Sequence, residues 1–434
     1  MLARGAWRVA YRSVAWLVIA SFFTVSCASR SVAPMGAGGK PFKPEVDELN
    51  LWAQAQKEEE QLQKKSKPYD DPLLDEYLAR IGDKLTPDDM REAGGPGFKF
   101  EVLRDPTLNA FAMPNGRVYI HTGLLARLDN EAQLAVIVGH EMTHVTNRHA
   151  LSFTRDARNT QIPFTVGVVA ASIGAAVAAG SRAGSGDYIG TTILSQTANV
   201  LLGLGLQLAA IAAINGYGRD LEREADAGGM ANLVRAGYDP KEAPKVFDRL
   251  RQESKDRGRL ETFFFGSHPR LTERVETTSD LIKTNYAVAA AAPDTVRNTD
   301  EFELRMRTVV RENARLDIQA GRFKLAEAQL DRVLTITPRD PVAQLYYGDL
   351  YRLQSQRARD AADKADKAQK ALKRYERAAE LDPAFPDPFR QLAFLYYQQK
   401  DNGRAKTAFQ KYLALKPDAP DARRIKEYLV ELDR

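Results

Sequence analysis

The pentapeptide HEMTH, residues 140–144, constrains the fold of this 434-residue chain more than any other feature. On an α-helix, His140 and His144 lie one turn apart on the same face, so both imidazoles can bind one zinc ion. Glu141 projects beside them, where it can act on a water molecule at the metal. The apolar run EAQLAVIVG before the motif is typical of a buried helix. The sequence therefore predicts a buried helix that carries a zinc site.

A catalytic zinc site needs a third protein ligand and one open position. No further histidine has the spacing that would supply this ligand, and the carboxylate candidate is Glu222, in GRDLEREADAGG (218–229). Glu222 and Asp226 are four residues apart and share a helical face, so one can bind the metal while the other orients a ligand histidine. Glu224 faces elsewhere. The chain has one cysteine, which excludes cysteine zinc sites, iron–sulfur clusters and internal disulfides.

The patterns before residue 285 mix helices and strands. Residues 71–85 have apolar residues at helical spacing, 98–105 alternate like a strand, and 117–125 read as a strand that runs into a helix. We therefore expect an α+β domain over 49–285, followed by a linker over 286–300.

The chain after residue 301 reads as helix and contains a repeat. An alanine precedes a proline by twelve residues and a larger apolar residue by four in three places: Ala326, Leu330 and Pro338; Ala371, Tyr375 and Pro383; Ala405, Phe409 and Pro417. The last two prolines are 34 residues apart, which is the tetratricopeptide period. The first two are 45 apart, and the excess fits a lengthened helix pair in the second repeat. We predict a tetratricopeptide domain over 301–434, with about three repeats and a capping helix; an unrelated helical bundle is the alternative.

The N-terminus has the pattern of an export signal. Three arginines precede the apolar stretch VAWLVIASFF, which ends in TVSC at Cys27. This ending resembles a bacterial lipobox, from which Thr24 departs, so we expect residues 1–27 to be a lipoprotein signal and Cys27 to be acylated. A plain secretory signal and an uncleaved anchor are the alternatives. Ala28 favours the outer membrane of the cell envelope, and 28–48 read as a flexible tether in the periplasm.

Composition narrows the class of protein further. With 44% hydrophobic and 27% charged residues, the chain is globular. The net charge of +5 includes three arginines of the signal, and no basic cluster is present. Nucleic acid is therefore not an expected partner.

Four blocks of sequence stand out: NAFAMPNGRVYIHTGLL (109–125), HEMTHVTNRHA (140–150), EREAD (222–226) and SHPRLTERV (267–275). Together they resemble the zinc peptidase family that holds the CAAX prenyl endopeptidases. The resemblance implies a gluzincin-like fold that binds one zinc ion per chain through His140, His144 and Glu222. It also implies that Glu141 is the general base and that Asp226 supports a ligand. The export signal and the repeats are similar to the periplasmic branch of the family, which implies quality control or assembly of outer-membrane proteins.

The resemblance places His268 near the metal, where its role stays open. It could donate a hydrogen bond to the oxyanion, occupy the fourth zinc position, or be structural. Arg274 either neutralises charge near the site or is solvated. His149 follows His144 by five residues, which favours capping or packing, and His121 at a strand end reads as structural.

Two further regions bear on substrates and membranes. Residues 109–120 resemble an edge strand near the cleft that could pair with an extended peptide, and a supporting hairpin is the alternative. The apolar stretches 163–180 and 199–214 could be helices that flank the cleft, a membrane span, or a surface-inserting pair or lid.

These observations favour a zinc-dependent endopeptidase of the bacterial envelope. Its expected substrates are unfolded or misassembled envelope proteins, and its repeats would bind protein partners. A chaperone-like assembly factor with a regulatory zinc site is the rival. A purely structural zinc site is disfavoured because it would not need Glu141.

Overall fold

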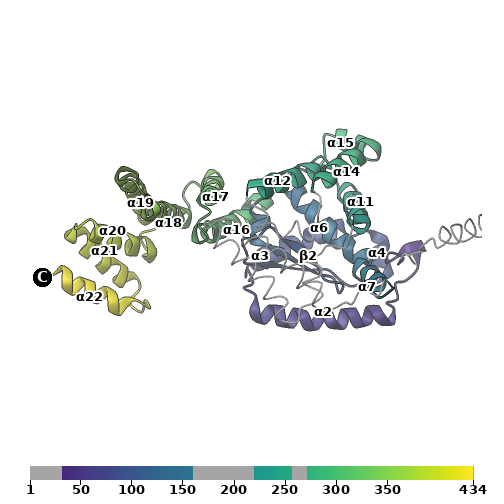
Figure 1. Ribbon diagram of the computed structural model, residues 1–434, viewed down its shortest axis with the longest axis horizontal. Helices are drawn as coiled ribbons and strands as arrows, with labels where there is room; N and C mark the ends of the chain where they lie inside the picture. The colour runs from purple at the N-terminus through teal and green to yellow at the C-terminus, as the bar shows by residue number, and fades with distance from the viewer. Residues whose placement is uncertain (1–31, 160–218, 257–270, 434) are drawn as a thin grey trace, which may run out of the picture.

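The computed structural model describes residues 32–159, 219–256 and 271–433. Within these ranges the elements are helices apart from one small sheet (Figure 1). In chain order, the elements before residue 300 are η1 (Ala37–Gly39), α2 (Val46–Lys65), α3 (Pro72–Leu85), α4 (Asp88–Ala93), β1 (Lys99–Leu103), β2 (Ala110–Ala112), β3 (Arg117–His121), α5 (Thr122–Leu125), α6 (Glu131–Thr146), α7 (His149–Asn159), α11 (Arg219–Arg235), α12 (Glu242–Asp256), α14 (Leu271–Thr284) and α15 (Ala287–Ala291).

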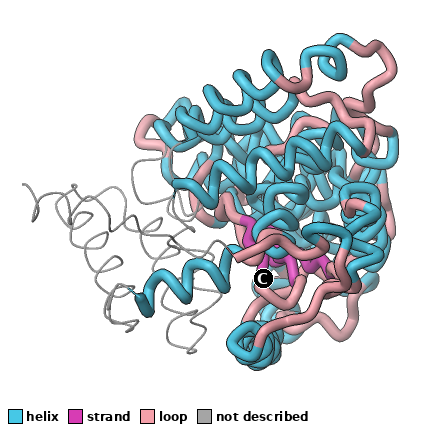
Figure 2. Tube along the Cα trace, turned by 90° about the vertical axis from the view of Figure 1, so that its right-hand side faces the viewer, coloured by secondary structure: helices cyan, strands magenta, loops and turns pink. Residues whose placement is uncertain are grey.

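The sheet has three strands in the order β1-β3-β2. β1 runs parallel to β3, with Lys99 opposite Arg117, and β2 runs antiparallel to β3, with Ala110 opposite Ile120. β2 is therefore an edge strand of the described sheet, whereas 117–120 belong to the central strand β3. Residues 109–120 thus form a hairpin of which only one strand is an edge, and its pairing with a peptide stays a prediction. Figure 2 shows the strands enclosed by helices and loops. The α+β fold class expected for this part of the chain is confirmed.

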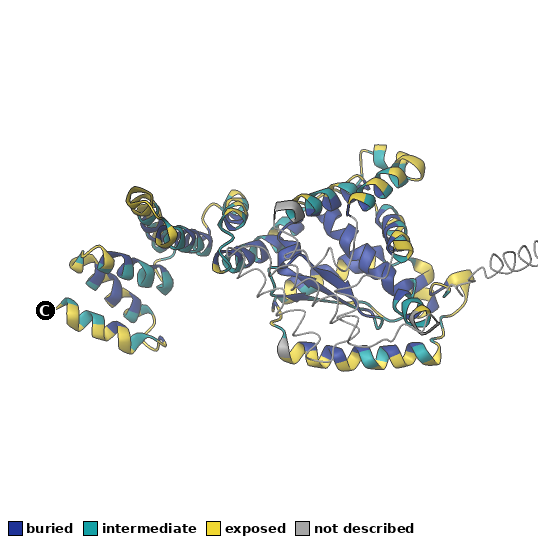
Figure 3. Ribbon diagram, in the orientation of Figure 1, coloured by how far each residue is buried: buried dark blue, intermediate teal, exposed yellow. Residues whose placement is uncertain are grey.

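Helix α6 forms the centre of this part of the molecule. The side chain of Asn130 accepts a hydrogen bond from the backbone N–H of Gln133 and so caps the first turn of the helix. All of its residues are buried, including the polar ones of HEMTH (Figure 3). Because buried polar groups must find partners inside the protein, α6 can be polar at its C-terminal end only if neighbouring elements supply them.

The C-terminal part consists of paired helices. Its elements are α16 (Asp300–Gln319), α17 (Phe323–Ile336), α18 (Pro341–Arg357), α19 (Ala361–Leu381), α20 (Pro386–Gln398), α21 (Asn402–Leu415) and α22 (Ala422–Leu432). The repeated alanines and the larger residues four positions later are fully buried, and each repeated proline follows the end of α17, α19 or α21. α18 and α19 have 17 and 21 residues, against 13 and 14 in α20 and α21, which confirms the lengthened second pair.

One apolar core joins the two parts of the chain. It runs from α3 and the sheet through α6, α11 and α12 into α16, α17 and α18, and a second core joins α18 to α22. Buried polar contacts reinforce the junction. Thr122 Oγ1 donates to Asn313 Oδ1 at 3.2 Å, and the Arg127 guanidinium lies 3.3 Å from Asp317 Oδ2. The first helix pair is therefore packed onto the domain that precedes it, and the division at residue 301 stays a prediction.

The N-terminal segment, residues 33–48, lies within the predicted tether but packs against the folded domain. The backbone N–H of Met35 donates to the Thr146 carbonyl at 2.8 Å, and that of Phe42 donates to Ala93. Met35 is buried. This segment therefore contacts the C-terminal end of α6.

Several predictions fall outside the described residues: the signal with Cys27, the apolar stretches 163–180 and 199–214, and His268. Among the helices that the structure does describe, none combines the length and the apolar character needed to cross a membrane.

Candidate metal centre

His140 and His144 project from the same face of α6, as the motif predicted. Their Nε2 atoms lie 3.0 Å apart, and the rings are nearly perpendicular, with an interplanar angle of 82°. Both residues are only 2% exposed. Two buried imidazole nitrogens that face one another need a shared proton or a shared cation between them.

Glu222 reaches this pair from α11, which crosses α6 at close range. Gly139 of α6 meets Gly229 of α11 at the crossing, where a Cβ atom added to Gly229 would lie 3.0 Å from the backbone nitrogen of His140. Larger residues would hold the two backbones apart. Glu222, Asp226 and Gly229 follow one another at helical spacing, so one face of α11 supplies both the close contact and the carboxylates.

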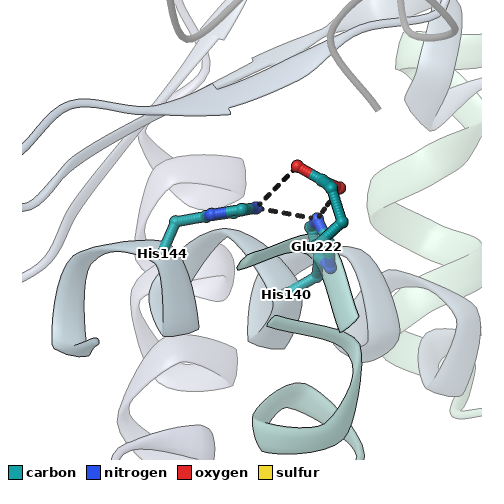
Figure 4. Close-up of side chains that lie close together, drawn as sticks. All are labelled: His140, His144 and Glu222. Carbon is teal, nitrogen blue, oxygen red and sulfur yellow. Dashed lines mark hydrogen bonds and ion pairs between the residues drawn. The ribbon is translucent and has the colours of Figure 1, made fainter. Parts of the chain in front are cut away.

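The donor set fits a zinc ion. Glu222 Oε2 lies 3.4 Å from His140 Nε2, and Glu222 Oε1 lies 3.6 Å from His144 Nε2 (Figure 4). One donor atom from each of the three residues lies within 4.8 Å of the others. Tetrahedral zinc with bonds of 2.0–2.2 Å needs ligand atoms about 3.3–3.5 Å apart. The three residues can therefore hold zinc with little movement, and the mix of nitrogen and oxygen donors suits this ion.

Behind His140 lies a buried ion pair. His140 Nδ1 is 2.9 Å from Asp226 Oδ1, and Arg274 Nε donates to Asp226 Oδ2 at 2.9 Å. Burial raises the pKa of Asp226, but the charge of Arg274 and the contact with His140 lower it overall. Arg274 is itself buried and its guanidinium lies 4.0 Å from the centre of the Phe247 ring. Asp226 is thus placed to accept the Nδ1–H of His140.

The same carboxylates act on the proton affinity of His140. Burial and Arg274 lower its pKa, but hydrogen bonds to Asp226 and Glu222 outweigh them and raise it to about 9. The raised pKa of His140 thus comes from the negative charge of the two carboxylates. A divalent cation bound at Nε2 would use the same attraction.

Behind His144 lies a different partner. Nδ1 of His144 is 2.8 Å from Nδ1 of His149, the first residue of α7. His149 is 1% exposed, and its Nε2 lies 3.4 Å from Glu224 Oε2. Glu224 does not reach the three donors, but it faces the histidine behind one of them. The spacing of five residues favours capping or packing for His149 only if the helix is continuous, whereas α6 ends at Thr146. The signal that could have revealed this contact is a third histidine close behind the motif.

Glu141 lies between the two histidines in the sequence of α6 and is 1% exposed. Its role as general base stays a prediction, as does the role of His268. His121 is buried at the end of β3, where its Nδ1 lies 2.7 Å from Thr107 Oγ1, in keeping with a structural role.

The edge strand ends near the metal centre. A small recess beside His144 is lined by Ala112 at the end of β2, by Met113 and Pro114, and by Leu151 of α7. The end of β2 therefore lies close to His144.

Comparison with known proteins agrees with this arrangement. Residues 72–282 match peptidase family M48, and residues 358–430 match a tetratricopeptide repeat family. The match to the repeat family contains the marker residues of the second and third predicted repeats, from Ala371 to Pro417. The first predicted repeat, with Ala326 and Pro338, lies outside the match.

Three of the relatives that match this chain have names that describe proteases. A Yersinia pestis protein named beta-barrel assembly-enhancing protease is 31% identical over 43% of this chain and 34% of its own length. A Vibrio cholerae protein is 28% identical over 61% of this chain and 50% of its own. The Schizosaccharomyces pombe mitochondrial metalloendopeptidase OMA1 is 29% identical over 46% of this chain and 50% of its own. The chain thus spans half or less of the length of these relatives.

Proposed function

We propose that the chain is a zinc-dependent endopeptidase of the bacterial cell envelope, because residues 72–282 match peptidase family M48 and residues 358–430 match a tetratricopeptide repeat family. The observation that carries this proposal is the buried group of three donors, His140, His144 and Glu222, beside Glu141. One turn of α6 supplies two of the donors and Glu141, and α11 supplies the third donor, so a cation site and a base lie side by side.

In this proposal His140, His144 and Glu222 would hold a zinc ion, which when bound would supply the Lewis acidity that polarises a carbonyl and activates water. Glu141 accepts the proton of the attacking water and passes it to the leaving amine. Asp226 accepts the Nδ1–H of His140 and so keeps its Nε2 directed at the metal.

We infer that substrate binds as an extended strand against β2. The outer backbone groups of an edge strand can pair with any extended peptide, so this mode depends little on sequence. The recess beside His144 would receive a side chain or backbone atoms of that peptide only after some local opening. Substrates of this kind must already be unfolded.

The location and partners are part of the proposal. Cys27 would carry the lipid anchor, the protein would face the periplasm from the outer membrane, and the repeats would bind partner proteins. The names of the bacterial relatives support a role in the assembly or quality control of outer-membrane β-barrel proteins.

Glu141→Gln tests the mechanism. The variant should bind one zinc ion per chain as the wild type does, but it should lose cleavage of a denatured model protein, because an amide cannot accept the proton of the water. The loss expected for a missing general base is about 10²–10⁴-fold. Glu76→Gln, on the exposed face of α3, is the matched control and should cleave normally.

The outcome separates the enzyme from its rival. Wild-type cleavage should also stop with a chelator and return with added zinc. Cleavage by zinc-loaded Glu141→Gln at the wild-type rate would contradict the assigned base. A wild type that binds zinc and unfolded protein but never cleaves it would instead support the chaperone-like assembly factor.

A further inference from the structure

The two ligand histidines are both contacted at their Nδ1 atoms, and the partner of His144 is a third imidazole. His144 Nδ1 and His149 Nδ1 are 2.8 Å apart, and the two rings are steeply inclined, at 76°. Both side chains are buried. The contact uses Nδ1 of His144, whereas the other ring nitrogen, Nε2, is the one that lies near Glu222.

The position of the protons follows from the contact. Two Nδ1 atoms at hydrogen-bond distance share one proton, so one ring donates and the other accepts. When Nε2 of His144 binds a metal, its Nδ1 must carry the hydrogen, and Nδ1 of His149 must accept it. The hydrogen of His149 then sits on Nε2, the atom that lies 3.4 Å from Glu224 Oε2.

A specific turn puts His149 in this place. α6 ends at Thr146, and Arg148 adopts a left-handed conformation with φ of 56° before α7 starts at His149. A left-handed residue just after a helix reverses the chain direction, which carries His149 back toward His144. Such a conformation costs free energy for a residue other than glycine, so contacts elsewhere must favour it.

The N-terminal segment supplies those contacts. The Arg148 guanidinium donates to both oxygens of Glu48, at 2.9 and 2.6 Å, and to the carbonyl of Ala33 at 3.2 Å. A two-point contact of arginine with a carboxylate holds the guanidinium in a defined orientation. Residues about one hundred positions away in the sequence therefore hold the turn that carries His149.

We propose that His149 is a positioning residue of the metal centre, which accepts the Nδ1–H of His144 and so directs its Nε2 at the metal. The inference rests on the proposed zinc site but not on proteolysis. Groups behind a metal-bound histidine typically change metal affinity by about 10–100-fold when they are lost. Glu224 orients His149 from the half-exposed side, and its removal should have a smaller effect.

The test compares two variants in the full-length chain. His149→Phe fills the space but cannot accept a hydrogen bond, whereas His149→Asn is smaller but offers its amide oxygen near the position of Nδ1. Zinc affinity is measured by competition with a chromophoric chelator, and the geometry of the site by the visible spectrum of the cobalt-substituted protein. Urea unfolding in the presence of a chelator reports any loss of stability that is independent of metal.

We expect His149→Phe to bind zinc about 10–100-fold more weakly than the wild type and to alter the cobalt spectrum, and His149→Asn to restore most of the affinity. Equal affinities of wild type and His149→Phe would overturn the inference, as would tighter binding by His149→Phe than by His149→Asn, since that order indicates packing. If His149→Phe does not fold, His149→Ala takes its place, and His149→Asn must then bind zinc more tightly than His149→Ala. A wild type that binds no zinc would refute the proposed function itself, a result distinct from all of these.

Discussion

The two histidines of the candidate metal centre are supported from behind by different physical means. His140 faces a charged pair, Asp226 and Arg274, that two later helices bring together in the interior. His144 faces the imidazole of His149, which the next helix presents across a turn held by the partly exposed N-terminal segment. A buried charged pair does not tolerate the loss of one member. The turn that carries His149 is instead held by a largely buried contact between Arg148 and Glu48 and by an exposed contact between Arg148 and Glu45, and salt weakens the exposed one. The candidate metal centre thus has a charged side, formed by Asp226 and Arg274 behind His140, and a neutral side, formed by His149 behind His144.

The charged side gives the largest expected effect. Asp226→Ala leaves Arg274 buried beside Phe247 without its carboxylate, and removing one partner of such a pair typically costs about 3–5 kcal/mol of unfolding free energy. The measurement is urea unfolding in the presence of a chelator, so that metal binding does not contribute. Combining Asp226→Leu with Arg274→Met removes both charges and should be less destabilising than Asp226→Ala alone. A change below about 1 kcal/mol for Asp226→Ala would show that the pair does not hold this side.

A change at the crossing of α6 and α11 should have an intermediate effect on stability. It should disturb the charged side of the metal centre and leave the neutral side intact. Gly229→Ala places a methyl group against the backbone of His140, so α11 must move away from α6 and carry Glu222 and Asp226 with it. Overpacking of this kind costs about 1–3 kcal/mol. Zinc affinity should fall as well, while the contact between His144 and His149 remains, because neither residue lies on α11.

Gly403→Ala is the matched control for the crossing. Gly403 lies near the start of α21, where an added Cβ atom meets nothing within 4 Å. This variant should be as stable as the wild type or slightly more stable, because alanine favours helix. Unchanged zinc affinity in Gly229→Ala would show that the close crossing does not position Glu222.

The N-terminal segment, residues 33–48, which holds the turn on the neutral side, gives the smallest effect, and its docking depends on pH. Hydrogen bonds from Arg155 lower the pKa of Glu45 below its ordinary value of 4.5 and that of Asp47 below 3.8. A lowered pKa stabilises the docked state above the ordinary pKa, and this contribution is lost as the pH falls through the lowered values. We expect backbone amides of residues 33–48 to exchange with solvent faster at pH 3.5 than at pH 6, after correction for intrinsic rates.

Arg155→Gln provides the control for this pH dependence. The variant lacks the guanidinium, so its N-terminal segment should exchange faster already at pH 6 and change less between the two pH values. If the wild type exchanges equally at both, the ion pairs of Arg155 do not hold the segment.

The motif and its spacing predicted most of the metal centre. Two histidines four residues apart on a buried helix must share a face, and the same holds for Glu222 and Asp226, so helical geometry alone places these groups. The repeated alanines likewise predicted the paired helices, because a small residue at each crossing is a local requirement. These features depend on residues close together in the sequence.

The support behind the ligands could not be predicted in the same way. The contact of His149 with His144 depends on a left-handed turn at Arg148 that distant acidic residues hold, and a periodic pattern contains no sign of it. The docking of residues 33–48 was not predicted, because a segment rich in glycine and proline is usually a tether. The position of Gly229 at the crossing depends on how α11 packs against α6, and the sequence of one helix does not contain this information.

The central claim is that His140, His144 and Glu222 bind one catalytic zinc ion. Anomalous X-ray scattering from crystals of the zinc-loaded protein, collected on both sides of the zinc absorption edge, tests it most directly. The account predicts one peak, about 2.0–2.2 Å from Nε2 of each histidine and from a carboxylate oxygen of Glu222. A peak elsewhere, or zinc bound without Glu222, would contradict it.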